Sequence, residues 1–248
     1  MEKILQIQDV KKIYFVDSSK KKKIKKNLPE STIEVHALDG VSADIEKGEF
    51  TAIAGPSGSG KTTLLNLIGC LDSITEGHIL LEGSDIATMN QKQKTLLRRE
   101  KIGFVFQSYN LIPVLTAQEN VEMALLLLNK FSKEEIKERA WNMLKEVGLD
   151  GLQDRTPSRL SGGQQQRISI ARALVKEPAV VLADEPTANL DSKNSKMILE
   201  LMKELNEKHN VTCIFSTHDQ LVMQTVRRII RIRDGKIENL NAPIPTGK

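Results

Sequence analysis

A glycine-rich stretch directly after a short apolar segment constrains this chain more than any other feature. Residues 50–54, FTAIA, form an apolar run of strand length, and residues 55–62, GPSGSGKT, follow it. They match the pattern G-x-x-x-x-G-K-[ST], in which glycines let the backbone curl until its N–H groups face phosphate oxygens. A helix expected over about 61–70 would add partial positive charge at its N-terminus. The sequence therefore predicts a phosphate-binding loop between a strand and a helix.

Two side chains of this loop have separate predicted roles. Lys61 would reach the β- and γ-phosphates of a nucleotide, and the Thr62 hydroxyl would bind Mg²⁺. The structural alternative is a glycine-rich turn with a solvated lysine, but the placement between strand and helix disfavours it. The predicted contacts with the phosphates are Gly55, Ser57, Gly58, Ser59, Gly60, Lys61, Thr62 and Thr63.

A second motif narrows the class of phosphate chemistry. Residues 180–185, VVLADE, are an apolar strand that ends in two carboxylates. Asp184 is placed to bind Mg²⁺, and Glu185 can orient or deprotonate a water molecule in line with the γ-phosphate. Carboxylates that merely lead the strand into solvent are the structural alternative, which the phosphate-binding loop disfavours. Because the chain contains no NKxD sequence for reading guanine, these motifs favour an ATPase over a GTPase.

Apolar strands that alternate with helices predict the fold class. The clearest helix covers 132–148, because Ser132 and Glu135 form a capping box, an apolar stripe follows, and Gly148 closes it. The expected strands are 4–10, 33–37, 50–54, 179–183 and 211–215, and the other expected helices are 61–70, 164–175 and 192–209. This order indicates an α/β fold whose mostly parallel sheet is covered on both faces.

Composition and charge disfavour several classes of protein. The formal net charge of +4, from 36 basic and 32 acidic residues, is too slight to predict a nucleic-acid partner. No stretch approaches the ~20 apolar residues of a membrane-spanning helix, and the first ten residues lack the features of a signal peptide. Cys70 and Cys213 lie among apolar residues, as expected of two buried thiols in a reducing compartment. We expect a cytoplasmic chain that reaches the membrane through a partner.

A third motif points to a family. Residues 160–164, LSGGQ, form a string that rarely arises by chance. The motifs GPSGSGKTT, FVFQ, RLSGGQQQR, VVLADEPT, NLD and STHD occur in this order, so the chain resembles the ATP-binding cassette (ABC) ATPases over nearly its whole length. The sequences of the segments FVFQSYNLIPVLTAQENV and DEPTANLDS are most similar to those of the lipoprotein-release, macrolide-export and cell-division ATPases. ATPases of antimicrobial-peptide resistance systems are closely similar as well.

The resemblance implies both the fold and its division. It implies a P-loop NTPase core with a mostly parallel sheet, an N-terminal antiparallel β subdomain and an inserted helical subdomain. We expect one nucleotide-binding domain over 1–248. The core and the antiparallel subdomain would comprise 1–106 and 176–248, and the helical subdomain would comprise 107–175.

The resemblance also implies roles for residues outside the first two motifs. Gln107 would contact Mg²⁺ or the attacking water, and His218 would contact the γ-phosphate. Tyr14 would stack on adenine, although packing in the sheet is the alternative and the lysine-rich segment after it departs from the shorter family pattern. Two copies would sandwich ATP, each closing the other's site. The residues expected at that shared site are Ser161, Gly162, Gly163, Gln164 and Asp191.

The implied partners are a second copy of the chain and a transmembrane permease subunit, with a periplasmic or extracytoplasmic adaptor as a further option. They would place the chain at the cytoplasmic face of the membrane. Residues 111–115, LIPVL, would either line a groove for a short helix of the permease or pack in the helical subdomain. Arg98, Arg99 and Lys101 are predicted to form a solvated face. The six lysines of 20–26 predict either a solvated loop or contact with anionic headgroups.

Two other function classes compete with a transporter ATPase. One is a membrane-associated scaffold or signalling subunit of the cell-division type, which would use ATP as a conformational switch. The other is a soluble ABC machine of DNA repair or translation. Repair members need a long coiled coil between the phosphate loop and LSGGQ, and translation factors carry two cassettes in one chain. This sequence has a single cassette with about a hundred residues between the two motifs, which disfavours the second class.

Overall fold

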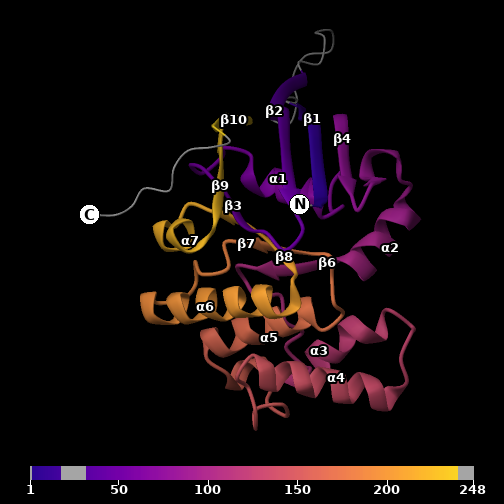
Figure 1. Ribbon diagram of the computed structural model, residues 1–248, viewed down its shortest axis with the longest axis vertical. Helices are drawn as coiled ribbons and strands as arrows, with labels where there is room; N and C mark the ends of the chain where they lie inside the picture. Colours follow the sequence, from indigo (N-terminus) through magenta and orange to yellow (C-terminus); the bar gives the residue numbers. More distant parts are fainter. Residues whose placement is uncertain (1, 18–31, 240–248) are drawn as a thin grey trace, which may run out of the picture.

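A six-stranded sheet forms the centre of the molecule (Figure 1). The computed structural model describes residues 2–17 and 32–239, so the lysine run at 20–26 lies outside the described residues. The strand order is β10-β9-β3-β8-β7-β6, and all neighbours pair in parallel except β10 with β9. The strands are β3 (Phe50–Ala54), β6 (Ile102–Phe106), β7 (Val180–Asp184), β8 (Thr212–Thr217), β9 (Arg228–Arg233) and β10 (Lys236–Asn239).

A second, antiparallel sheet covers one face of the first. Its order is β2-β1-β4-β5, with β1 (Lys3–Asp17), β2 (Thr32–Glu46), β4 (Glu76–Leu81) and β5 (Ser84–Asp85). The strands β1 and β2 are much longer than the segments 4–10 and 33–37 expected from apolar alternation. Irregular pairing after Ile7 and after Val10 explains the difference, because a bulge breaks the alternation of side chains without ending the strand. The predicted antiparallel subdomain is present.

Seven α-helices and two short 3₁₀ turns complete the described part of the chain. The helix expected over 132–148 is confirmed: Ser132 and Glu135 form a capping box, the apolar stripe is buried, and Gly148 follows with a left-handed backbone. The helices are α1 (Lys61–Ile68), α2 (Gln91–Lys101), α3 (Ala117–Leu126), α4 (Lys133–Glu146), α5 (Gly162–Leu174), α6 (Ser192–His209) and α7 (Gln220–Thr225). The turns are η2 (Ile86–Thr88) and η3 (Pro157–Arg159).

Both faces of the central sheet are buried, as the apolar runs predicted. Alternate residues of each strand belong to different cores: Phe50 and Val181 pack with α3 to α6, whereas Ile53 and Leu182 pack with α1 and the antiparallel sheet. Figure 1 shows these two layers on opposite sides of the sheet. The result is the predicted α/β architecture with its carboxyl strand ends free to build a site.

Two expectations about individual side chains have different outcomes. Cys70 and Cys213 are buried thiols, as predicted, and burial raises the pKa of Cys213 to about 12. The predicted solvated face is wrong for Arg98, whose Nη1 donates a hydrogen bond of 2.6 Å to the carbonyl of Cys70. The last turn of α2 lies against the end of α1, which buries part of this side chain. Within 2–17 and 32–239, no helix has the length and apolar character needed to cross a bilayer.

Candidate functional site

The predicted phosphate ligands lie around one cavity of about 590 Å³. Its walls come from five places in the sequence, because the carboxyl ends of the parallel strands β3, β7 and β8 meet at the same edge of the sheet. The lining residues are Val35, His36, Ala37, residues 56–63, Gln107, Asp184, Glu185 and His218. The fold therefore brings the first two motifs together with Gln107 and His218, as the sequence predicted.

Two glycines of the phosphate loop are required by close backbone contacts. A Cβ atom on Gly60, where φ is +105°, would lie 2.5 Å from the carbonyl oxygen of Ala37. A Cβ atom on Gly55 would lie 2.0 Å from the carbonyl oxygen of Ile232. These distances are shorter than van der Waals contact, so the loop can curl only with glycine at both positions.

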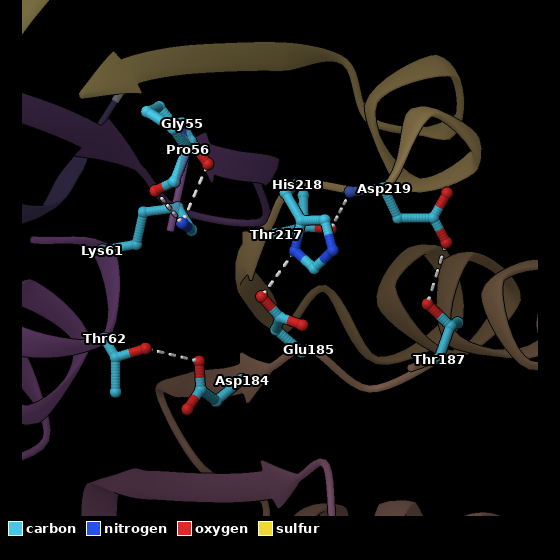
Figure 2. Close-up of polar contacts among 10 residues, drawn as sticks. All are labelled: Gly55, Pro56, Lys61, Thr62, Asp184, Glu185, Thr187, Thr217, His218 and Asp219. Carbon is cyan, nitrogen blue, oxygen red and sulfur yellow. Dashed lines mark hydrogen bonds and ion pairs between the residues drawn. The ribbon is translucent and has the colours of Figure 1, made fainter. Parts of the chain in front are cut away.

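The side chain of Lys61 is buried inside the curl of the loop. Its Nζ donates hydrogen bonds of 2.9 Å to the carbonyl of Gly55 and 2.8 Å to the carbonyl of Pro56 (Figure 2). Only 6% of the residue is exposed. Since Lys61 opens α1, its charge and the helix N-terminus act on the same part of the cavity. This arrangement suits an anion bound in the loop.

Two oxygen ligands for a hard cation lie next to each other at the edge of the cavity. Thr62 Oγ1, in the first turn of α1, donates a hydrogen bond of 3.2 Å to Asp184 Oδ1 at the end of β7 (Figure 2). Mg²⁺ prefers such oxygen ligands and is usually bound by one or two carboxylates together with substrate phosphates. The residues present therefore fit Mg²⁺ beside a phosphate group.

Glu185 and His218 form a pair at the mouth of the cavity. Glu185 Oε1 lies 2.7 Å from His218 Nδ1 (Figure 2). The backbone N–H of Glu185 donates to the carbonyl of Ser216 at 3.0 Å. Glu185 has a φ of 44°, a left-handed conformation that is strained for a residue with a side chain. The paired strands β7 and β8 hold it there, because Asp184 before it and Ser216, which accepts its N–H, are both fixed by the sheet.

The LSGGQ residues lie elsewhere. Ser161 caps the N-terminus of α5: its Oγ accepts from the N–H of Gln164 at 3.3 Å, and Gln164 Oε1 accepts from the N–H of Ser161 at 2.9 Å. In the described part of the chain, none of Ser161, Gly162, Gly163 and Gln164 lines the phosphate cavity. Asp191 caps α6 in the same manner and is likewise absent from the lining. The predicted site residues thus form two separate groups within one chain.

Tyr14 lies on β1 beside the cavity rather than in its wall. It pairs across the sheet with Val35, which does line the cavity, and 37% of Tyr14 is exposed. Its hydroxyl donates a hydrogen bond of 2.7 Å to Asp72 Oδ2. This partly exposed position beside the cavity is compatible with stacking on a nucleotide base.

Sequence reasoning missed two sets of residues near the site. Val35, His36 and Ala37 of β2 line the cavity, but the alternation over 33–37 indicated only a strand and gave no signal of what it faces. Gln166 is fully buried, and its Nε2 donates 2.8 Å to the carbonyl of Pro186, which follows Glu185. Its helical spacing from buried Ile170 in GGQQQRISI was a signal that could have placed it on the inner face of α5.

Comparison with known proteins agrees with this geometry. The family model described as ABC transporter matches residues 38–188. An ABC transporter ATP-binding protein of Thermotoga maritima is 45% identical over 97% of this chain and 96% of its own length. The macrolide export ATP-binding/permease protein MacB of Syntrophobacter fumaroxidans is 45% identical over 95% of this chain. The chain spans only 31% of that relative's length.

A solved structure shares the whole fold. The ATP-binding cassette MJ0796 was solved as a dimer in a post-hydrolysis state bound to ADP and Pi. The relative that carries this name comes from Methanocaldococcus jannaschii. The solved cassette is 42% identical to this chain, with a TM-score of 0.81 over 96% of this chain and 100% of that structure. With the family match over more than half of its length, this chain belongs to the ABC transporter family, as an ATP-binding cassette.

Proposed function

We propose that this chain is the ATP-hydrolysing subunit of a membrane ABC transporter and that two copies close around two ATP molecules. The proposal rests on one observation: the predicted site residues form two separate groups within the chain. One cavity collects the groups that bind and cleave phosphate, while the helix end formed by Ser161 to Gln164 lies outside it. The dimeric MJ0796 cassette bound to ADP and Pi supports both the hydrolysis and the pairing of copies.

Phosphate binding depends on the loop and the first turn of α1. Backbone N–H groups of Gly55 and of residues 57–60 would face the β- and γ-phosphates, and Lys61 would exchange its loop carbonyls for phosphate oxygens. Ser57, Gly58, Ser59 and Thr63 line the same cavity. Thr62 and Asp184 would hold Mg²⁺, which supplies positive charge to the phosphates when it is bound.

Hydrolysis requires a water molecule aligned with the γ-phosphate. Glu185 is the group placed to accept its proton, and His218, at 2.7 Å, restricts where the carboxylate can point. Gln107 lies in the same wall and would orient the water. The proton passes to the Glu185 carboxylate while the water oxygen attacks phosphorus, and the leaving oxygen of ADP departs on the opposite side.

The second copy would complete the site from outside. The N-terminus of α5 offers N–H groups and a partial positive charge to a γ-phosphate. Asp191, at the start of α6, would cross the same interface. A two-fold pairing would build two such sites. We also propose that the chain is a single domain, 1–248, in which residues 107–175 form a helical subdomain. This subdomain carries α5.

The transmembrane partner would bind an apolar groove of about 610 Å³ between α2, β6, α3 and α5. Of the residues at 111–115, Ile112 lines this groove and would contact the permease helix. Leu111 instead packs on the hydrophobic core. Arg98, Arg172 and Lys176 also line it. Among the described residues none of these three cations forms an ion pair with a carboxylate. A short amphipathic helix with an acidic residue fits this chemistry.

Docking on that helix would hold the chain at the cytoplasmic face of the membrane. A periplasmic or extracytoplasmic adaptor would then contact the permease and not this chain. The MacB relative joins an ATP-binding part and a permease in one name, which supports a permease partner for this cassette.

Replacing Glu185 by Gln tests hydrolysis and pairing together. We expect steady-state ATP hydrolysis to fall by about 10²–10⁴-fold, because an amide cannot accept the proton of the water. ATP binding should persist, so ATP-bridged dimers should accumulate in size-exclusion chromatography with Mg-ATP, with chemical crosslinking as the control. A variant that binds ATP and stays monomeric under crosslinking would contradict the proposed closure around ATP.

A further inference from the structure

Three side chains, Lys12, Tyr14 and Asp72, form a cluster that the phosphate site does not use; we call it the Tyr14 clamp. The Tyr14 hydroxyl donates 2.7 Å to Asp72 Oδ2, and Lys12 Nζ donates 2.8 Å to Asp72 Oδ1. Lys12 Nζ also lies 4.7 Å from the centre of the Tyr14 ring. We propose that Asp72, together with Lys12, is a positioning residue that fixes the Tyr14 ring for stacking on adenine. This inference rests on the proposed nucleotide site.

Asp72 is itself firmly held between the phosphate loop and β1. Its N–H donates to the carbonyl of Asn66 in α1 at 3.3 Å, and α1 begins at the phosphate loop. Three residues further on, the N–H of Thr75 donates 3.1 Å to Lys11 of β1, and the N–H of Ile13 donates 3.1 Å to Thr75 Oγ1. The clamp therefore fixes the position of Tyr14 relative to the helix that follows the phosphates.

Both carboxylate oxygens of Asp72 already accept hydrogen bonds within or next to the clamp. Oδ1 accepts from Lys12 and from the N–H of Ser73 at 2.6 Å, and Oδ2 accepts from Tyr14. Partial burial opposes ionisation of Asp72, but the hydrogen bonds from Lys12 and Tyr14 outweigh it and lower its pKa. Burial and the hydrogen bond to Asp72 raise the pKa of Tyr14, so its hydroxyl stays a donor. Asp72 is therefore placed to act on a nucleotide through Tyr14.

The clamp also selects one face of the Tyr14 ring. The Lys12 ammonium occupies one side, and a cation over an aromatic face is an attractive contact. Adenine would have to stack on the opposite side. Tyr14 and Val35 are cross-strand partners, so their side chains project from the same face of the sheet, and Val35 lines the phosphate cavity. A ring fixed in advance at this place loses less rotamer entropy when adenine binds.

A simpler role for Asp72 is to neutralise Lys12, of which only 8% is exposed. This role predicts an effect of Asp72 on folding stability and none on adenine. The clamp predicts instead that Asp72 contributes to the affinity for ATP and makes no contribution to the affinity for inorganic tripolyphosphate, which has no adenine. The two roles thus differ in a measurable ratio of affinities.

The experiment uses the full chain with Mg²⁺ and calorimetric titration of ATP and of tripolyphosphate. Tyr14→Phe removes the hydroxyl and keeps the ring, so we expect ATP to bind roughly 3–10-fold more weakly, the size of one ordinary net hydrogen bond, with tripolyphosphate unchanged. Asp72→Asn should weaken ATP by a similar factor and add nothing in the Tyr14→Phe background. Glu76→Gln is the matched control, because it removes the carboxylate 2.8 Å from the neighbouring Lys11.

Tyr14→Ala separates failure of the clamp from failure of the proposed site. If Tyr14→Ala leaves the affinity for ATP unchanged, Tyr14 does not stack on adenine and the underlying site assignment fails. If Tyr14→Ala weakens ATP while Tyr14→Phe binds like the parent protein, the clamp alone is overturned. Equal losses for ATP and tripolyphosphate in Asp72→Asn, or an undiminished loss in the Tyr14→Phe background, would also overturn it. Tyr14→Phe changes no charge, so it decides the matter even if Asp72→Asn folds poorly.

Discussion

The phosphate cavity and the N-terminus of α5 differ in how their polar groups are satisfied. In the cavity, the reactive groups bond to one another or to the loop: Lys61 to loop carbonyls, Thr62 to Asp184, and Glu185 to His218. At α5, the helix end is satisfied only by its own capping box and lies outside the cavity. The phosphate cavity is assembled from distant segments of one chain. The N-terminus of α5 is stabilised by local hydrogen bonds and lies outside that cavity.

Under the proposed dimer, a single chain would carry two halves of different sites. A ligand entering the cavity must replace hydrogen bonds that the chain already makes, so binding there is an exchange. A phosphate reaching α5 would meet a helix end whose capping hydrogen bonds are local, between Ser161 and Gln164. The proposed dimer assigns each half a partner from the other copy, and two measurements test that assignment. A third compares the two ends of α5.

Mixing two inactive variants has the largest expected effect. Lys61→Ala should abolish hydrolysis by disabling its own phosphate loop, and Ser161→Arg should abolish it by blocking the partner's γ-phosphate. If the halves combine across copies, a mixed dimer contains one intact site. Random pairing of equal amounts should then restore roughly a quarter of parental activity, provided that the sites act independently. The measurement is ATP hydrolysis as a function of the mixing ratio.

No recovery, with crosslinking proof that mixed dimers formed, would contradict the shared site or the independence of its two copies. Each variant measured alone at the same total concentration is the control. A chain that built its whole site alone would also give no recovery.

Two identical caps allow a smaller and sharper test. Ser161 of α5 and Ser132 of α4 make the same capping box, with Gln164 and Glu135 respectively. Ser→Ala at either position should lower the free energy of unfolding by about 1 kcal/mol, because a helix N–H loses its acceptor. Only Ser161→Ala should also weaken ATP-dependent dimerisation of the Glu185→Gln form, measured by light scattering. Equal dimerisation by both variants would leave α5 a purely structural helix.

The opposite end of α5 has the smallest expected effect. Lys176 follows α5, and burial lowers its pKa to about 8 while its Nζ donates to the carbonyls of Arg98 and Arg99. An unfolded lysine, with a pKa near ~10.4, binds more protons than the folded one between about pH 8 and pH 10. The stability should therefore rise with pH across this window.

Lys176→Met should flatten that rise, as measured by urea unfolding at several pH values. Lys101→Met, which removes a lysine that pairs with Glu82 at 2.8 Å, is the matched control. A parental stability that falls between pH 8 and pH 10, or an unchanged slope in Lys176→Met, would mean that Lys176 is not buried as a cation in solution.

Local chemistry explains which features the sequence could predict. The phosphate loop was predictable because glycines, Lys61 and Thr62 are required at fixed spacing between a strand and a helix. The cap of α4 was predictable because Ser132 and Glu135 interact over three residues. The resemblance to ABC ATPases also predicted the two sheets correctly. It predicted that Gln107 and His218 lie at the phosphate site, and both line the same cavity.

Contacts between distant segments could not be predicted in this way. Tyr14 meets Asp72 across 58 residues, and Arg98 meets Cys70 across 28, so neither contact leaves a periodic signal. Arg98 looked solvated because it begins a charged run, residues 98–101, and its hydrogen bond to Cys70, just beyond α1, joins segments far apart in the sequence. The full length of β1 was hidden by irregular pairing around Val10, where alternation fails but the strand continues.

The left-handed backbone of Glu185 sets stability and activity against each other at one position. Glycine adopts a φ of 44° without the penalty of roughly 1–2 kcal/mol that a side chain incurs there. Selection of a variant library for resistance to heat alone would therefore enrich Glu185→Gly. The selected variants would then lack the proposed proton acceptor. Engineers who stabilise this cassette must select for turnover at the same time, or hold residue 185 constant.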